Sequence, residues 1–228
     1  MTAVVLSIQV GLPRHLGTSD ATSHFDQPWT SGFFKEPIAG PVHVGWTNLS
    51  GDGQADLVNH GGVDKAVLAY AATHYPAWRA ELGQTELPYG AFGENLTIDG
   101  VTEGDVCIGD VWRAGLVVFE VSQPRQPCWK LARRWRIQEL PGRVVETGRS
   151  GWYLRVREMG TIEAGTGMEL VARPNPEWTV TRANHVMYFQ RLDTAAMEEL
   201  AAVPGLSASW QETLVERARR LHEAKKVL

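Results

Sequence analysis

Cysteine is scarce in this sequence, which has two cysteines among its 228 residues. Cys107 and Cys128 stand in different local contexts and outline no disulfide framework, which favours a reducing, cytoplasmic setting. The sequence also lacks an apolar run of the roughly 18 residues that a membrane span needs. Residues 1–10 have neither the basic start nor the cleavage site of a signal peptide. We therefore expect a cytoplasmic protein without a membrane partner.

A large excess of one charge is absent as well. The chain has 22 basic and 26 acidic residues and a net charge of -4, so we expect no stable binding to nucleic acid. Its hydrophobic fraction of 43% and charged fraction of 21% are those of an ordinary globular protein. A chain of this length can bury a substantial core, as one domain or as one domain with a small appendage.

The sequence does contain a cysteine between cations, in SQPRQPCWK at residues 122–130. Its two prolines restrain the backbone, so a stiff, irregular loop is expected to follow the apolar strand at residues 116–121. A helix is expected to begin at residue 129. Its N-terminus, together with Arg125 and Lys130, favours the thiolate form of Cys128, which attacks electrophiles or binds metals.

The residues alone leave a second interpretation of this thiol open. Free cysteine is among the most buried residue types, and many cysteines only fill a core. Cys107, which alternates with apolar neighbours, is expected to be of that kind. For Cys128 the local chemistry leaves function and structure about equally supported.

Three further motifs carry side chains suited to binding. Lys35 follows two aromatic residues and precedes a pre-proline residue, which restrains it more than most surface lysines. In HGGVDK at residues 60–65, paired glycines let backbone N–H groups approach an anion, although the pattern is also typical of a tight turn. Glu94 and Asn95 follow Gly93, where they can bind the N–H and C=O groups of a heterocycle or cap the turn.

Short apolar segments with glycine-containing turns between them predict most of the fold. The expected strands lie at residues 4–10, 41–46, 66–70, 106–108, 111–114, 116–121, 151–157 and 168–172, with a further strand within 92–100. This crowding favours a closed or nearly closed antiparallel sheet. Residues 14–28 are expected to form a loop, and helices are expected at 73–82, 129–140 and 144–148.

The composition changes after Pro174 and Pro176, which mark a linker. Three helices are expected beyond it, at residues 179–188, 193–202 and 209–223, the last with a capping box that begins at Ser209. We therefore predict an α+β, mainly β protein. Its domains are a barrel at residues 1–172 and a linker with a three-helix domain at 173–228.

Taken in order, four motifs resemble the MOSC family, which is named for the C-terminal domain of molybdenum cofactor sulfurase. They are FFKEP at residues 33–37, HGGVDK at 60–65, FGENL at 92–96 and SQPRQPCWK at 122–130. The resemblance is closest to the small stand-alone bacterial branch linked to resistance to N-hydroxylated bases such as 6-N-hydroxylaminopurine. It covers residues 1–172, and the three-helix tail is similar to the C-terminal domain of that branch. It implies a MOSC-like β-barrel with peripheral helices and a small C-terminal three-helix domain.

The resemblance also implies a molybdenum cofactor, molybdopterin, for which Cys128 is the metal ligand and catalytic centre. A soft thiolate suits such a metal. Arg125 is the favoured holder of the anionic cofactor, because it lies close to Cys128 and suits bidentate contact with phosphate. The full set of cofactor-binding candidates is Lys35, His60, Gly61, Gly62, Glu94, Asn95, Ser122, Arg125 and Lys130.

The implied activity is that of a molybdenum-dependent oxidoreductase that reduces N-hydroxylated compounds and so detoxifies base analogues. The sequence has no flavin or nicotinamide motif, so a separate reductase is expected to supply the electrons. Two alternatives stay open: a persulfide or sulfur carrier that uses Cys128, and a molybdenum cofactor binding module without turnover. The tryptophans and C-terminal helices suit either a homodimer interface or packing between the two domains.

Overall fold

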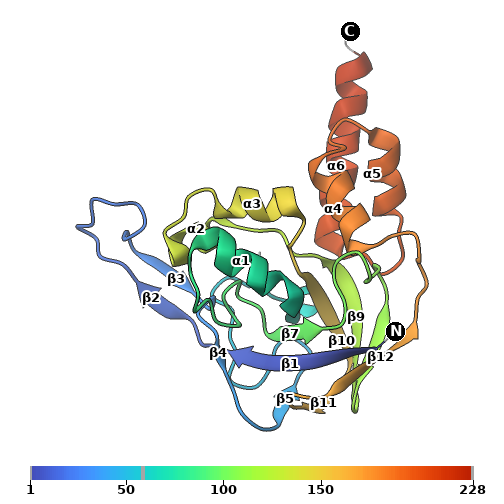
Figure 1. Ribbon diagram of the computed structural model, residues 1–228. Coiled ribbons are helices and arrows are strands. Elements are labelled where there is room, and N and C mark those ends of the chain that lie inside the picture. The colour runs from blue at the N-terminus through green and yellow to red at the C-terminus, as the bar shows by residue number, and fades with distance from the viewer. Residues whose placement is uncertain (1, 58–59, 227–228) are drawn as a thin grey trace.

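Seven strands close into a β-barrel in the part of the chain that the computed structural model describes, residues 2–57 and 60–226 (Figure 1). Around the barrel the order is β12, β8, β9, β10, β6, β7 and β1, and β1 pairs with β12 to close it. Their bounds are β1 Thr2–Val10, β6 Val67–Ala71, β7 Leu96–Asp99, β8 Val111–Ala114, β9 Val117–Pro124, β10 Trp152–Glu158 and β12 Gly167–Ala172. The predicted α+β, mainly β fold with a barrel is confirmed.

One pair of barrel strands is parallel, which corrects the expectation of an antiparallel sheet. Ala69 of β6 lies beside Leu96 of β7 in parallel register. Parallel neighbours need a crossover connection, and helix α1 (Tyr75–Leu82) lies within it. The helix predicted at residues 73–82 is therefore confirmed, and it ends at Gly83 in the left-handed conformation.

Strand β9 leads to Cys128 and is buried along its whole length. It is longer than predicted, because the strand continues through Ser122 and Gln123 to Pro124, which is in register with Trp152 of β10. The proline is tolerated because it stands at the last position of the strand, where the ladder needs no further N–H group. The irregular loop that precedes Cys128 is correspondingly shorter than predicted.

Outside the barrel strands two local predictions change, those of the loop at residues 14–28 and of the strand at residues 106–108. β2 (Arg14–Leu16) pairs with β3 (Trp29–Ser31), so the segment expected to be a loop begins with a strand. β5 (Val42–Val44) pairs with β11 (Gly160–Ile162), and β4 (Glu36–Pro37) pairs with the end of β1. Residues 106–108, although fully described, form no regular strand; Cys107 makes a single bridge to Thr179 before Gly109 turns the chain with a φ of 80°.

Two helices follow Cys128, as predicted, but their bounds differ from the expected residues 129–140 and 144–148. α2 (Trp129–Trp135) ends where Arg136 adopts a left-handed φ of 56°, and α3 (Leu140–Thr147) starts a new axis. Pro141 in the first turn of α3 explains the break, because proline starts a helix readily and cannot continue one. Both helices pack with α1 over a second apolar cluster, which includes Trp78, Leu131 and Val144.

The C-terminal helical unit consists of α4 (Val180–Tyr188), α5 (Thr194–Ala201) and α6 (Ala208–Lys226), which stand together at one side of the barrel (Figure 1). Its apolar residues, among them Trp210 and Leu214, belong to the same buried cluster as the barrel interior. The predicted capping box at Ser209 is wrong: α6 begins one residue earlier, and the Ser207 hydroxyl accepts the Trp210 N–H at 3.3 Å. In the described part of the chain, no helix has the length and apolarity to cross a bilayer. The domain boundary at residue 172 stays a prediction.

Candidate functional site

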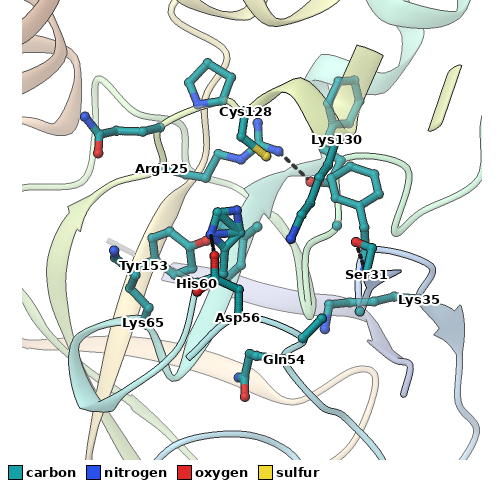
Figure 2. Close-up of a pocket in the computed structure, with 18 of the residues that line it drawn as sticks. Ser31, Lys35, Gln54, Asp56, His60, Lys65, Arg125, Cys128, Lys130 and Tyr153 are labelled. Atoms are coloured by element: carbon teal, nitrogen blue, oxygen red, sulfur yellow. Dashed lines mark hydrogen bonds and ion pairs between the residues drawn. The ribbon is translucent and has the colours of Figure 1, made fainter. Parts of the chain in front are cut away.

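A cavity of about 820 Å³ opens where β9 ends and α2 begins (Figure 2). Cys128 lies on its wall, and the lining carries the basic side chains Lys35, His60, Lys65, Arg125 and Lys130 against the two carboxylates of Asp52 and Asp56. In a chain with a net charge of -4, this concentration of basic groups is a local feature of the cavity. Such a lining favours an anionic ligand.

Cys128 occupies the N-cap position, the residue just before the first turn of α2. Its backbone is extended, with φ -123° and ψ 169°, and its side chain makes no capping hydrogen bond. The thiol is half-buried, in contrast to the fully buried Cys107. Figure 2 shows the Cys128 and Arg125 side chains projecting into the same cavity. This placement leaves the sulfur available to a ligand that enters the cavity.

Arg125 holds a buried guanidinium that is only partly satisfied by the protein. The residue is 4% exposed, and its Nη2 donates to the Phe92 carbonyl at 3.1 Å. Its Nη1 is buried and has no hydrogen-bond partner among the described residues. A buried donor left unpaired costs about 1–3 kcal/mol, so an anionic group in the cavity would relieve an existing penalty.

His60 is also incompletely satisfied. Its buried Nδ1 makes no hydrogen bond to the described residues, and the nearest carboxylate oxygen, on Asp56, is 4.0 Å away. Burial, followed by the charge of Lys130, lowers the pKa of His60 to about 4. The ring is therefore neutral near pH 7 and offers an anion a hydrogen bond rather than a positive charge.

Acid is expected to destabilise the protein through His60. Its folded-state pKa of about 4 lies below the ordinary value of 6.5, so the unfolded chain binds the extra proton between these values. The stabilisation is thus complete above pH 6.5 and is lost as the pH falls to about 4. Because the ring is 34% exposed, screening reduces the loss to about 1–2 kcal/mol.

Urea unfolding of the wild-type protein and of His60→Gln, at about pH 7 and about pH 4, measures this effect. From about pH 7 to about pH 4 the free energy of unfolding should fall more in the wild type than in His60→Gln. An equal pH dependence in both proteins would contradict the low pKa of His60.

Lys35 and Asn95 form one network at the cavity wall. Lys35 donates to the buried carboxylate of Asp52, whose other oxygen accepts from Asn95 Nδ2 at 2.9 Å. Burial lowers the pKa of Lys35, and Asp52 opposes that shift. The Asn95 side chain also accepts the Leu68 N–H at 3.1 Å. Asp52 therefore offsets the charge of Lys35, a partnership across 17 positions that the sequence pattern did not predict.

Four predicted cofactor-binding residues lie outside the cavity lining. The Glu94 carboxylate is fully buried and accepts hydrogen bonds from the Gly90 N–H at 2.7 Å, the Phe92 N–H at 3.1 Å and the Tyr75 hydroxyl. These contacts match the alternative in which Glu94 stabilises the turn. The remaining three are the buried Ser122, whose hydroxyl donates to the Tyr153 carbonyl at 3.1 Å, and the turn residues Gly61 and Gly62.

Sequence reasoning missed several residues of the cavity wall. Tyr153 reaches it because β10 pairs with β9, which sets Tyr153 beside Gln123. Burial raises the pKa of Tyr153 to about 12, so its phenol keeps its proton near pH 7. Lys65 belongs to the predicted HGGVDK motif, and burial lowers its pKa. The strand pattern at residues 151–157 indicated alternation of faces but not which face meets the cavity.

Aromatic side chains border the cavity beside the cysteine. The rings of Trp29 and Trp129 lie 5.5 Å apart, and Trp129 is 53% exposed. Lys130 Nζ lies 5.9 Å from the Trp129 ring centre. Within residues 2–57 and 60–226, no three His, Cys, Asp or Glu side chains gather as a metal site built by the protein alone.

Comparison with known proteins identifies two family models in this chain. The MOSC domain model matches residues 56–169, and the YiiM-like, 3-alpha helix domain model matches residues 178–220. An uncharacterized protein, YflK of Bacillus subtilis, is 42% identical over 95% of both chains. The crystal structure of YiiM from Geobacillus stearothermophilus has a TM-score of 0.78 and 38% identity, covering 95% of this chain and 99% of that one. A protein of Gibberella moniliformis named a reductase is 38% identical over 77% of this chain. The matched segment spans 32% of the length of that protein.

Proposed function

This chain belongs to the MOSC domain family, and on that basis we propose that it is a molybdenum-cofactor-dependent reductase of N-hydroxylated compounds. The name of the Gibberella relative supports a reductase at the coarser level. The substrate class, base analogues such as 6-N-hydroxylaminopurine, comes from the resemblance of the motifs. The cytoplasmic location, and a homodimer, remain parts of the proposal.

The observation that carries the proposal is the Nη1 of Arg125, which has no hydrogen-bond partner among the residues that the structure describes, in the same cavity as the half-buried thiol of Cys128. Molybdopterin is anionic, and its metal is thiophilic. A buried guanidinium with unmet donors fits the first property, and an accessible cysteine fits the second. The residues present therefore fit this group.

Each side chain has a defined part in this proposal. Cys128 would ligate the metal, and Arg125 and Lys130 would hold the anionic portion of the cofactor. His60 would add a neutral hydrogen bond, since its pKa of about 4 leaves it uncharged near pH 7. Lys35 would contribute less, because Asp52 already pairs with it.

The bound cofactor supplies the two-electron redox chemistry of the reaction. In the overall reaction the N–O bond of the substrate breaks, two electrons and two protons are consumed, and the oxygen leaves as water. A separate reductase provides the electrons. The protein binds and orients the reactants, and it confines the reaction to a partly enclosed cavity.

A persulfide carrier is the second candidate, and the half-buried thiol with no capping hydrogen bond favours it. In that function Cys128 would carry an extra sulfur and would bind no metal. A cofactor-binding module without turnover would retain molybdenum and pterin but reduce nothing.

Purification from a host that makes molybdenum cofactor tests the proposal. We expect molybdenum and pterin in about equimolar amounts with the protein, and reduction of 6-N-hydroxylaminopurine with reduced benzyl viologen as donor. Retained cofactor without reduction would support the binding module instead. Mass spectrometry that finds an added sulfur on Cys128, lost on reduction, in protein without molybdenum would support the carrier.

A further inference from the structure

The C-terminal helical unit reaches the cavity through the first turns of α6. Ser209 and Thr213 both line the cavity, and they lie one turn apart on the same face of the helix. Both residues are exposed, so their hydroxyl groups are at the opening rather than in the core. The Thr213 hydroxyl donates to the Ser209 carbonyl at 2.7 Å and can still accept a hydrogen bond.

The same helical unit contacts the segment that leads to Cys128 at three points. The Ser207 N–H donates to the Ser122 carbonyl at 2.9 Å, and the Ser209 hydroxyl donates to Gln123 Oε1 at 3.3 Å. In α4, a side-chain hydrogen bond with Gln126 lowers the pKa of Tyr188 and opposes the rise that burial causes. The helices therefore position the residues just before the cysteine and complete one wall of its cavity.

The chemistry of this wall differs from that of the cationic groups. Its side chains are carboxamides and hydroxyls, from Gln123, Gln126, Ser209 and Thr213. The Gln123 carboxamide is buried and already engaged, since its Nε2 donates to the Pro124 carbonyl at 3.1 Å and its Oε1 accepts from Ser209. The exposed hydroxyls of Ser209 and Thr213 carry no charge and can each accept a hydrogen bond from a ligand, and the half-exposed Trp129 lines the same cavity. An uncharged planar heterocycle fits such surroundings, because the N–H groups at its edge can donate to these hydroxyl oxygens and its faces can stack on an aromatic ring.

We propose that Ser209 and Thr213 of α6 form the subsite that binds the heterocyclic ring of the N-hydroxylated substrate, and that Gln123 of β9 positions the Ser209 hydroxyl. The C-terminal helical unit thereby selects the substrate, while the cations of the barrel hold the cofactor. Gln126 is a positioning residue, since its side chain is engaged by Tyr188. The inference rests on the proposed function and assigns the substrate's ring to this part of the cavity.

Titration calorimetry of 6-N-hydroxylaminopurine into the cofactor-loaded protein tests the subsite without relying on turnover. Thr213→Val removes one hydroxyl at nearly constant volume, and we expect it to weaken binding about fivefold, the equivalent of one hydrogen bond. Ser209→Ala combined with Thr213→Val should weaken binding roughly 20-fold. Val215→Thr, which adds a hydroxyl at a position of α6 that is 54% exposed and outside the lining, is the matched control and should bind like the wild type.

Thermal unfolding and molybdenum content, measured on each variant, distinguish loss of the subsite from loss of the fold. A subsite role raises KM more than it lowers kcat, and it reduces selectivity for the purine over N-hydroxyurea, which has no ring to bind. If the wild type binds and reduces the base but all variants bind it equally well, the subsite is wrong and the proposed function stands. If the cofactor-loaded wild type neither binds nor reduces the base, both are overturned.

Discussion

Replacement of Cys128 by serine is expected to lower the rate of viologen-driven reduction by more than about 100-fold. The reason is the ligand chemistry: a serine hydroxyl stays protonated near pH 7 and is a hard donor, whereas a thiolate is soft and anionic. Residues that only support a metal ligand already cost about 10- to 100-fold when they are mutated, so loss of the ligand itself should cost more. X-ray absorption at the molybdenum edge should show one sulfur ligand fewer, and the molybdenum content should fall.

Cys107→Ala is the matched control for this variant. Cys107 is 1% exposed and lies outside the cavity, and its thiol donates weakly to the Pro176 carbonyl at 3.5 Å. Burial raises the pKa of this thiol, which makes it less able to form a thiolate. The control should keep its molybdenum and its sulfur coordination. Unchanged metal content and sulfur coordination in Cys128→Ser would refute the ligand assignment.

Replacement of Arg125 by glutamine is expected to weaken retention of the cofactor by roughly 10- to 100-fold. The buried guanidinium has an Nη1 that is unpaired within the described part of the chain, and a charge-assisted hydrogen bond to an anion contributes about 1.5–3 kcal/mol. Arg125→Lys keeps the charge but loses the planar fork of donors, so it should be intermediate. Pterin fluorescence after oxidation and dialysis measures how much cofactor each variant retains.

Arg143→Gln serves as the control for Arg125, because Arg143 lies on α3 and pairs with Glu81 at 3.1 Å on the surface. It should retain cofactor like the wild type, since exposed ion pairs contribute little. Glutamine at position 125 also loses the contact to the Phe92 carbonyl, so unfolding must be measured in parallel. Full pterin retention in a folded Arg125→Gln protein would remove Arg125 from the proposed cofactor site.

Much of the barrel could be predicted, because each strand has a local pattern of apolar residues bounded by turn residues. The apolar segments at residues 4–10 and 151–157 became β1 and β10, and the helix that ends at Gly83 was expected from local signals. The parallel neighbours β6 and β7 could not be predicted in the same way. Strand pairing depends on how the chain crosses over between segments, and local patterns of side chains do not encode that path.

The candidate site was predictable only where its residues are close together in the sequence. Arg125, Cys128 and Lys130 are neighbours in sequence, so a shared location followed from the chain itself. Asp52 pairs with Lys35 across 17 positions, and Tyr153 faces the cavity only through its pairing with β9. Glu94 has the expected turn position and bonds locally to Gly90, Phe92 and Thr97, but its contact with the Tyr75 hydroxyl comes from tertiary packing.

The sequence by itself determined the mainly β fold, the cysteine among cations and the helical character of the C-terminal segment, residues 179–223. These features depend on side-chain pattern and turn chemistry over a few residues. Only the tertiary structure decided that Asp52 offsets Lys35, that Arg125 keeps a donor with no partner in residues 2–57 and 60–226, and that α6 supplies Ser209 and Thr213 to the cavity. Those facts follow from closure of the barrel and from the common core that it shares with the helices, which bring distant residues into hydrogen-bonding distance.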